Sequence, residues 1–272
     1  MDYIPLFYWS SKIFEGKDQE NYGDILAQYI VEKVSGRKVN FFNAPKQRKK
    51  WLKKPYLMAI GSIMRYAQPK ASVWGSGIIS REDTFAKATF HAVRGPLSRK
   101  RILEQGYECP ENYGDPALLL PKYYTPDVKK KYKLGFVPHY VDHKCVNNWY
   151  KNNPDALVID LLDDDIFKTT DSIASCEKVI SSSLHGVIVA QAYGIPAIWV
   201  QFSDKLSGDN IKFVDYFESV QIMPYQATVI SEQKTISYYK SLFETFQSQV
   251  DIDVLESVQN NLIQAFPQQY ML

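Results

Sequence analysis

Three cysteines, Cys109, Cys145 and Cys176, are all that this chain of 272 residues contains, and no two of them form a CxxC motif. An odd, scattered set argues against a disulfide framework or a zinc knuckle and favours a reducing compartment. No window approaches the roughly 20 apolar residues of a membrane span, and the first residues lack the basic start of a signal peptide. We therefore expect a cytoplasmic protein.

The chain also lacks an excess of charge of one sign. Its 32 Lys and Arg residues and 30 Asp and Glu residues leave a net charge of +2, which implies no nucleic-acid partner. The one dense basic run, KQRKKWLKK at residues 46–54, is predicted to be a solvated loop. Peripheral docking at the inner face of an anionic membrane is a second hypothesis, because each Lys or Arg near such a surface adds about 1 kcal/mol.

Several catalytic motifs are absent as well. The chain has no GxSxG, HExxH or GxxxxGK[ST], which argues against a serine hydrolase elbow, a zincin and a P-loop. The segment that begins at Gly75, GSGIIS, lacks the third glycine of a dinucleotide fingerprint. His139 and His143 are four residues apart but have no third ligand in register, and residues 163–165 (DDD) are better explained as helix caps. We expect no metal and no organic cofactor.

What the chain does have is an alternation of apolar strand-like runs and helical patterns through both halves. This alternation predicts parallel sheets covered by helices on both faces. We predict an α/β fold of two Rossmann-like domains, residues 1–128 and 129–272, with two amphipathic C-terminal helices after residue 231. The polar, lysine-rich segment 125–133 is the expected linker. A cleft between the domains would bind ligands outside the carboxyl ends of the strands.

The most informative stretch is VISSSLHGVIVAQAYGIP, residues 179–196. It predicts a buried strand, a turn of three serines and a helix. A helix that starts after a strand directs its N–H groups toward the ligand edge of the sheet and stabilises an anion there. The turn and the helix start carry further donors: Ser181, Ser182, Ser183 and His185. Simple capping by Ser183 and a surface position for His185 are the alternative.

Other expected strand ends carry charged or small residues. Asp24 follows a strand and loop at a helix start, so it suits an N-cap, a general base or both. Arg94 ends an apolar strand, and its guanidinium can hold a carboxylate or phosphate in bidentate fashion. The remaining candidates for substrate binding are Asn21, Gly75, Ser76, His139, Lys205 and Lys212. One carboxylate facing several cations suits a small, multiply anionic donor and a hydroxyl acceptor.

In order along the chain, the motifs NYGD, GSG, VRGPLSR, GDPALLLP, GFVPHY and SSSLHGVIVAQAYGIPAIW resemble those of the polysaccharide pyruvyl transferases, over residues 20–220. The resemblance implies a two-domain fold like that of GT-B glycosyltransferases, with phosphoenolpyruvate as donor. The enolpyruvyl group would pass to a sugar of an exopolysaccharide or capsule precursor, free or lipid-linked, and close as a ketal across two hydroxyls.

The resemblance also implies roles for single residues. Asp24 would be the general base and Arg94 a ligand of the anionic donor, while His139 and His185 would contact phosphate or act as the acid. Two other functions stay open: a GT-B glycosyltransferase that uses a nucleotide sugar, and a non-catalytic protein that binds sugar or phosphate.

One departure from the family pattern concerns the phosphate. Many members have Arg-Leu-His-Gly where this chain has Ser183-Leu184-His185-Gly186, so the arginine that would anchor phosphate is missing. We expect a lysine of the segment SDKLSGDNIK, Lys205 or Lys212, to replace it together with the cations at other strand ends.

Overall fold

The structure is a computed structural model and describes residues 3–43 and 54–272. The basic run at residues 46–54 lies outside the described residues except for Lys54, which is exposed. No helix within these two ranges is long and apolar enough to cross a membrane.

The first half of the chain forms a sheet of five parallel strands. In spatial order these are β2 (Lys38–Phe41), β1 (Tyr3–Phe7), β3 (Tyr56–Met58), β4 (Ala71–Trp74) and β5 (Thr89–Ala92). The central strands β3 and β4 are buried at every residue, as expected for a parallel sheet covered on both faces. The helices of this half are α1 (Ser11–Glu15), α2 (Tyr22–Ser35), the 3₁₀ helix η1 (Met64–Tyr66) and α3 (Pro96–Glu104).

The second half forms another five-stranded parallel sheet. Its spatial order is β10 (Thr228–Val229), β9 (Ala197–Gln201), β8 (Cys176–Ser181), β6 (Tyr132–Val137) and β7 (Ala156–Val158). Between and after these strands run α4 (Tyr140–Tyr150), α5 (Ile166–Ala174), α6 (Leu184–Ala192), α7 (Ile211–Ser219) and α8 (Ile236–Thr245). The prediction of an α/β fold with two parallel sheets is therefore confirmed.

Both sheets have the same strand order. Counted along each half, the order is 2-1-3-4-5, the doubly wound arrangement in which consecutive crossovers leave the first strand on opposite sides. The switch point lies between β1 and β3 in one sheet and between β6 and β8 in the other. Ligands of such sheets bind outside the carboxyl ends of the strands at this point, so each half offers one half of a site.

The two halves are joined more closely than a simple linker requires. The 3₁₀ helix η2 (Pro116–Lys122) packs against both α2 and α6, and its apolar residues belong to a core that continues through both halves. The connection from β5 to β6 contains the predicted boundary at 128 and 129.

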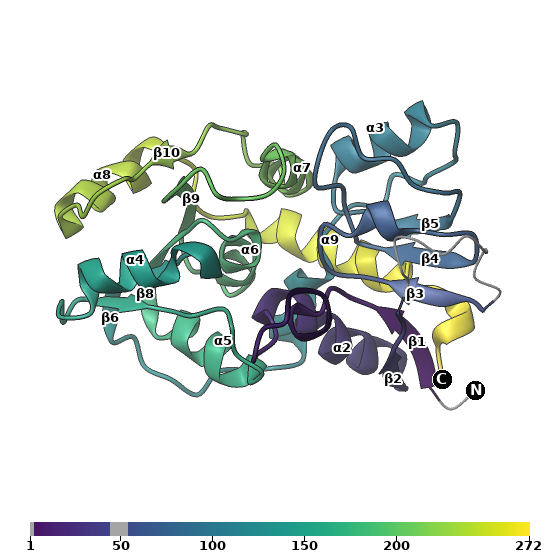
Figure 1. The fold of residues 1–272 in the computed structure, drawn as a ribbon, viewed down its shortest axis with the longest axis horizontal. Coiled ribbons are helices and arrows are strands. Elements are labelled where there is room, and N and C mark those ends of the chain that lie inside the picture. Colours follow the sequence, from purple (N-terminus) through teal and green to yellow (C-terminus); the bar gives the residue numbers. More distant parts are fainter. Residues whose placement is uncertain (1–2, 44–53) are drawn as a thin grey trace.

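The last helices divide between the two sheets. After α8 the chain returns to the first sheet as α9 (Ile252–Gln264) and η3 (Gln268–Tyr270) (Figure 1). Trp74 Nε1 donates a hydrogen bond to Leu262 O at 2.8 Å, and Leu272 N donates to Ser35 O at 3.1 Å. The final segment was predicted with residues 129–272, and the structure instead packs it on the first half.

Candidate active site

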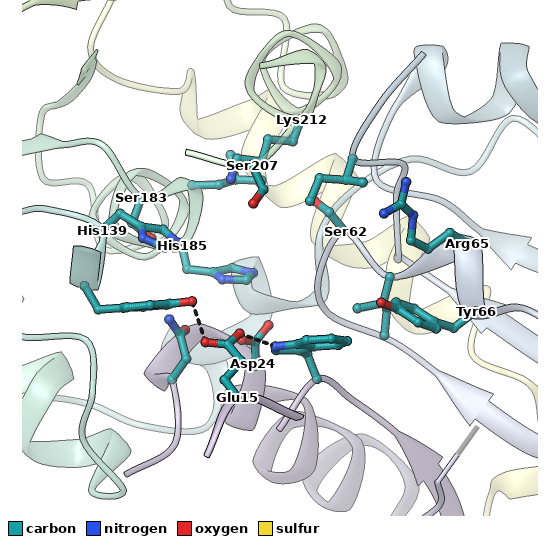
Figure 2. Close-up of a pocket in the computed structure, with 16 residues that line it drawn as sticks. Glu15, Asp24, Ser62, Arg65, Tyr66, His139, Ser183, His185, Ser207 and Lys212 are labelled. Carbon is teal, nitrogen blue, oxygen red and sulfur yellow. Dashed lines mark hydrogen bonds between the residues drawn. The ribbon is translucent and has the colours of Figure 1, made fainter. Parts of the chain in front are cut away.

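A cavity of about 320 Å³ lies between the two switch points. Figure 2 shows side chains from both halves pointing into it. Its lining residues are Trp9, Glu15, Asn21, Asp24, Ser62, Ile63, Arg65, Tyr66 and Ile79 from the first half, and His139, Tyr140, Ser183, Leu184, His185, Ser207 and Lys212 from the second. The volume is at the small end of the range for ligand pockets, about 300–1,000 Å³.

Four helices begin at this cavity. α2, α4, α6 and α7 each place a residue of their cap or first turn on its wall. Because each follows a strand or loop at the carboxyl edge of its sheet, their N-termini converge from both halves. Each helix dipole stabilises a nearby anion by about 0.3–1 kcal/mol, although several of the first N–H groups, such as those of Tyr22 and Gly23, already have partners. The cavity therefore favours a ligand with more than one negative charge.

Asp24 is the third residue of α2 and is not its cap. Asn21 is the N-cap and accepts a hydrogen bond from Gly23 N at 3.0 Å. Burial, and to a smaller extent the nearby carboxylate of Glu15, raises the pKa of Asp24 to about 7, although His185 and Lys212 oppose this shift. A carboxylate that titrates near neutral pH is suited to exchange a proton with a substrate hydroxyl.

His185 occupies the first turn of α6, and its ring points into the cavity in the direction of Asp24 (Figure 2). The ring lies against the start of α2: a Cβ at Gly23 would come 1.9 Å from His185 Nδ1. Only glycine leaves room for this approach. The sequence NYGD therefore brings the carboxylate of one half next to the imidazole of the other.

Lys212 and His139 supply the other titratable groups from the second half. Burial, and next the Arg94 guanidinium, lowers the pKa of Lys212 to about 8, so the amine still carries a proton at pH 7. Burial and Lys212 lower the pKa of His139 to about 4, so its ring is neutral at pH 7. The His139 side chain also caps α4 by accepting a hydrogen bond from Val141 N, and the backbone N–H of His139 donates to Ser182 Oγ at 2.9 Å.

A carboxylate bridges the halves at the edge of the cavity. Glu15, at the end of α1, accepts hydrogen bonds from Trp9 Nε1 and from Tyr140 Oη, both at 2.7 Å. Trp9 belongs to the first half and Tyr140 to the second, at the start of α4. This contact holds the two walls of the cavity together on the side of Asp24.

Comparison with known proteins decides the family. The model of the polysaccharide pyruvyl transferase family matches residues 21–204, which span the start of α2, the turn with His185 and all but one of the helix starts described above. The chain belongs to this family.

Two relatives agree with the family match. The chain is 33% identical over 172 residues to an uncharacterized protein of Acanthamoeba polyphaga mimivirus, an alignment that covers 60% of this chain and 59% of the relative. It is 25% identical over 182 residues to the succinoglycan biosynthesis protein ExoV of Rhizobium meliloti, covering 61% of this chain and 54% of the relative. The chain thus matches less than two thirds of the length of either relative.

For this member of the pyruvyl transferase family, the structure corrects the expected place of Arg94. Its side chain is fully buried behind the cavity wall, with Nη2 2.9 Å from Asp215 Oδ2. Nη1 donates to Ser62 Oγ and Nη2 to Ile78 O, each at 2.7 Å. These partners occupy the guanidinium. Arg94 therefore supports Ser62, a residue of the cavity wall, and does not line the cavity itself.

Five other predicted substrate-binding residues also lie outside the cavity: Gly75, Ser76, Ser181, Ser182 and Lys205. Three of the hydroxyls hold loops, because Ser76 Oγ donates to Gly61 O, Ser181 Oγ accepts from Ser183 N, and Ser182 Oγ accepts from His139 N. A Cβ at Gly75 would lie 2.2 Å from Pro116, and the side chain of Lys205 is exposed on a loop.

The structure does bring together Asp24, Asn21, His139, His185, Ser183 and Lys212. Their roles remain predictions. Ser183 is the N-cap residue of α6, but its side chain makes no capping hydrogen bond. Its hydroxyl lines the cavity, and simple capping by this side chain is not observed.

Sequence reasoning missed three charged residues of the site. Arg65 and Glu15 line the cavity, and Asp115 lies directly behind His185. Arg65 lies on η1, the short helix after β3. A search for charged residues after strands, which selected the other candidates, could therefore have found it. The motif GDPALLLP contains Asp115 but indicates no role for it, and Glu15 lies on a five-residue helix that is too short to show a periodic apolar pattern.

Proposed function

We propose that this protein transfers the enolpyruvyl group of phosphoenolpyruvate to two hydroxyls of a sugar in a cell-surface polysaccharide precursor, forming a pyruvate ketal. One observation carries the proposal: four helix N-termini and Lys212 converge on a cavity that also holds Asp24. Phosphoenolpyruvate carries a phosphate and a carboxylate, which suits this concentration of positive potential. A carboxylate with a pKa near 7 suits the deprotonation of a hydroxyl.

The proposed chemistry begins with protonation of the donor. His185 gives a proton to the methylene carbon of phosphoenolpyruvate, which leaves an oxocarbenium-like centre on the adjacent carbon. An acceptor hydroxyl attacks this centre while Asp24 takes the hydroxyl proton. The neutral ring of His139 would contribute hydrogen bonds and not the proton.

Loss of phosphate and attack by the second hydroxyl complete the reaction. The bond between the carbon and the phosphate oxygen breaks, and Lys212 with the helix N-termini stabilises the charge on the departing group. The second hydroxyl then attacks the same carbon and closes the ketal. Of the two hydroxyl protons, one replaces the proton that His185 gave to the methylene carbon, and the other leaves with the phosphate as hydrogen phosphate.

The proposal assigns the halves as in a GT-B-like enzyme. The acceptor would contact Asp24, Glu15 and Arg65 on the first half, and the donor would contact Lys212, His139 and His185 on the second. We also propose that the protein acts in the cytoplasm and that its acceptor is lipid-linked and is reached at the inner face of the membrane. The family and the relative named for succinoglycan biosynthesis support a polysaccharide precursor as acceptor.

Ligand-induced thermal stabilisation is the first test. Phosphoenolpyruvate should raise the melting temperature, and a panel of nucleotide sugars should not. Stabilisation by a nucleotide sugar alone would favour a glycosyltransferase. The second test follows phosphate release and the methyl signal of the ketal by proton NMR with a panel of sugar acceptors, with Asp24→Asn as the inactive control.

A further inference from the structure

A buried carboxylate lies behind His185 and faces its second ring nitrogen. Asp115 caps η2, and its Oδ1 accepts a hydrogen bond from Ala117 N at 3.0 Å. Its Oδ2 lies 3.8 Å from His185 Nε2. Within residues 3–43 and 54–272, neither of these two atoms has a hydrogen-bond partner, and both are buried from solvent.

Two unpaired polar atoms that face each other in the interior are unfavourable. A buried donor or acceptor without a partner loses its hydrogen bonds to water and gains none in return. A shift of the ring by about 1 Å would bring the two atoms to hydrogen-bond distance, and catalytic hydrogen bonds are often long before a substrate is bound. The two atoms are therefore placed so that a small movement of the ring would form a hydrogen bond between them.

The two nitrogens of His185 face different surroundings. Nε2 faces Asp115, whereas Nδ1 lies beside Gly23, in the turn of α2 that also carries Asp24. Besides Asp24, the charged and titratable residues that share the cavity with the ring are Lys212 from α7, His139 and Tyr140 from the start of α4, Glu15 from α1, and Arg65 and Tyr66 from η1. Asp115 itself does not line the cavity.

We propose that Asp115 is the positioning residue of His185: its Oδ2 accepts a hydrogen bond from the protonated Nε2 and so leaves Nδ1 as the nitrogen that serves the reaction. The kinetic part rests on the proposed pyruvyl transfer, in which the proton on Nδ1 passes to the methylene carbon of the donor. The proton on Nε2 stays in place, so the neutral ring that results is the tautomer that a carboxylate at Asp115 stabilises.

The state of the ring can be measured without any knowledge of the reaction. The chain has four histidines, so nitrogen-15 NMR spectra of the imidazoles can be assigned by replacing His91, His139 and His143 in turn. At a pH where the ring is neutral, His185 should show a protonated Nε2 and a bare Nδ1. The opposite tautomer in the unmutated protein would overturn the proposal, even if no variant of Asp115 folds.

Asp115→Asn provides the sharper comparison. The amide oxygen can still accept the hydrogen bond from Ala117, so the cap remains, but an amide nitrogen now faces Nε2 and donates to it. We expect the tautomer of His185 to reverse. A comparable replacement in another enzyme's Asp–His pair lowers kcat by about 10⁴-fold, and we expect a loss of about 10²- to 10⁴-fold here with the KM for phosphoenolpyruvate nearly unchanged.

Asp165→Asn is the matched control. Asp165 caps α5 in the same way, accepting from Phe167 N at 3.0 Å, and it lies away from the cavity, so tautomer and kcat should stay as in the unmutated protein. If Asp115→Asn keeps the tautomer and full kcat, Asp115 is only a cap. If Asp115→Asn reverses the tautomer but the unmutated protein shows no pyruvyl transfer, the positioning role of Asp115 stands and the proposed function is refuted.

Discussion

Arg94 and Asp215 form an ion pair in which both side chains are fully buried, with Nη2 2.9 Å from Oδ2. The pair joins the end of the first sheet to α7, the helix that carries Lys212 into the cavity. Asp215 also accepts hydrogen bonds from the N–H and the hydroxyl of Ser98, at 2.9 and 2.6 Å. The guanidinium therefore holds the two halves together and fixes the helix that carries a charge of the site.

Removing one member of this pair should destabilise the protein strongly. Arg94→Met leaves the Asp215 carboxylate buried without its counter-ion, and such a loss costs about 3–5 kcal/mol. Chemical denaturation measures the change. Arg81→Ala is the control, because the pair of Arg81 with Asp209 joins the same regions but lies at the surface, where a pair contributes about 0–1 kcal/mol. Equal effects of the two changes would contradict the structural role of Arg94.

The pH dependence of turnover should be bell-shaped, with its maximum between pH 7 and pH 8. Asp24 must lose its proton to act as the base, and its pKa is raised to about 7, so the rate rises with pH through that value. Lys212 must keep its proton to bind phosphate, and its pKa is lowered to about 8, so the rate falls above it. Lys212→Arg should move the alkaline limb to higher pH, because arginine does not titrate in this range.

Glu15→Gln should move the acid limb to lower pH. The negative charge of Glu15 is one cause of the raised pKa of Asp24, so its removal makes deprotonation easier. Turnover measured from pH 5 to pH 8 gives the shift. Glu32→Gln, on the same half but outside the cavity wall, should leave the limb in place. An acid limb that does not respond to Glu15 would assign that limb to another group.

Asp24→Asn should stabilise the protein above neutral pH while it lowers turnover by about 10²-fold or more. The pKa of Asp24 is higher in the folded than in the unfolded state, so the folded state binds this proton more tightly than the unfolded state does. Stability is therefore lost as pH rises from about 4 to about 7. An amide cannot ionise, and the expected gain at pH 8 is about 1–3 kcal/mol by denaturation. A variant less stable than the unmutated protein at pH 8 would contradict the buried-charge explanation.

Donor affinity should depend on Lys212 and not on Lys205. Lys212 lines the cavity, whereas Lys205 is exposed on the loop before it, so only the first amine can reach a bound phosphate. Calorimetry with phosphoenolpyruvate should show a Kd raised at least about tenfold for Lys212→Met, the equivalent of about 1.4 kcal/mol. Lys205→Met serves as the control with unchanged affinity. Equal losses in the two variants would show that the loop binds the donor in another conformation.

Much of the site follows from one rule that the sequence makes available. Parallel strands end at the same edge of their sheet, so residues just after strands converge, and this rule correctly placed Asp24, His139, His185 and Lys212 around one cavity. The same rule fails for Arg94, because the direction of a side chain at a strand end depends on its partners. Its partner Asp215 lies 121 residues away, and nothing local in the sequence indicates that contact.

Two edge strands, β2 and β10, escaped prediction for a different reason. β2 and β10 lie at the edges of their sheets and bury little apolar surface, so neither has the continuous apolar run that marks a buried strand. The position of α9 also depends on tertiary packing. Its amphipathic pattern predicts a helix, but periodicity does not specify which of two apolar sheets the helix covers.

The return of α9 to the first sheet has a consequence for how the protein is made. Trp74 is completely buried, and its indole nitrogen is hydrogen-bonded to Leu262 of that helix. A ribosome synthesises Trp74 early and Leu262 nearly two hundred residues later. The first sheet must therefore wait, with this face uncovered, while the entire second sheet emerges, and α9 can cover the face only after Leu262 has left the exit tunnel.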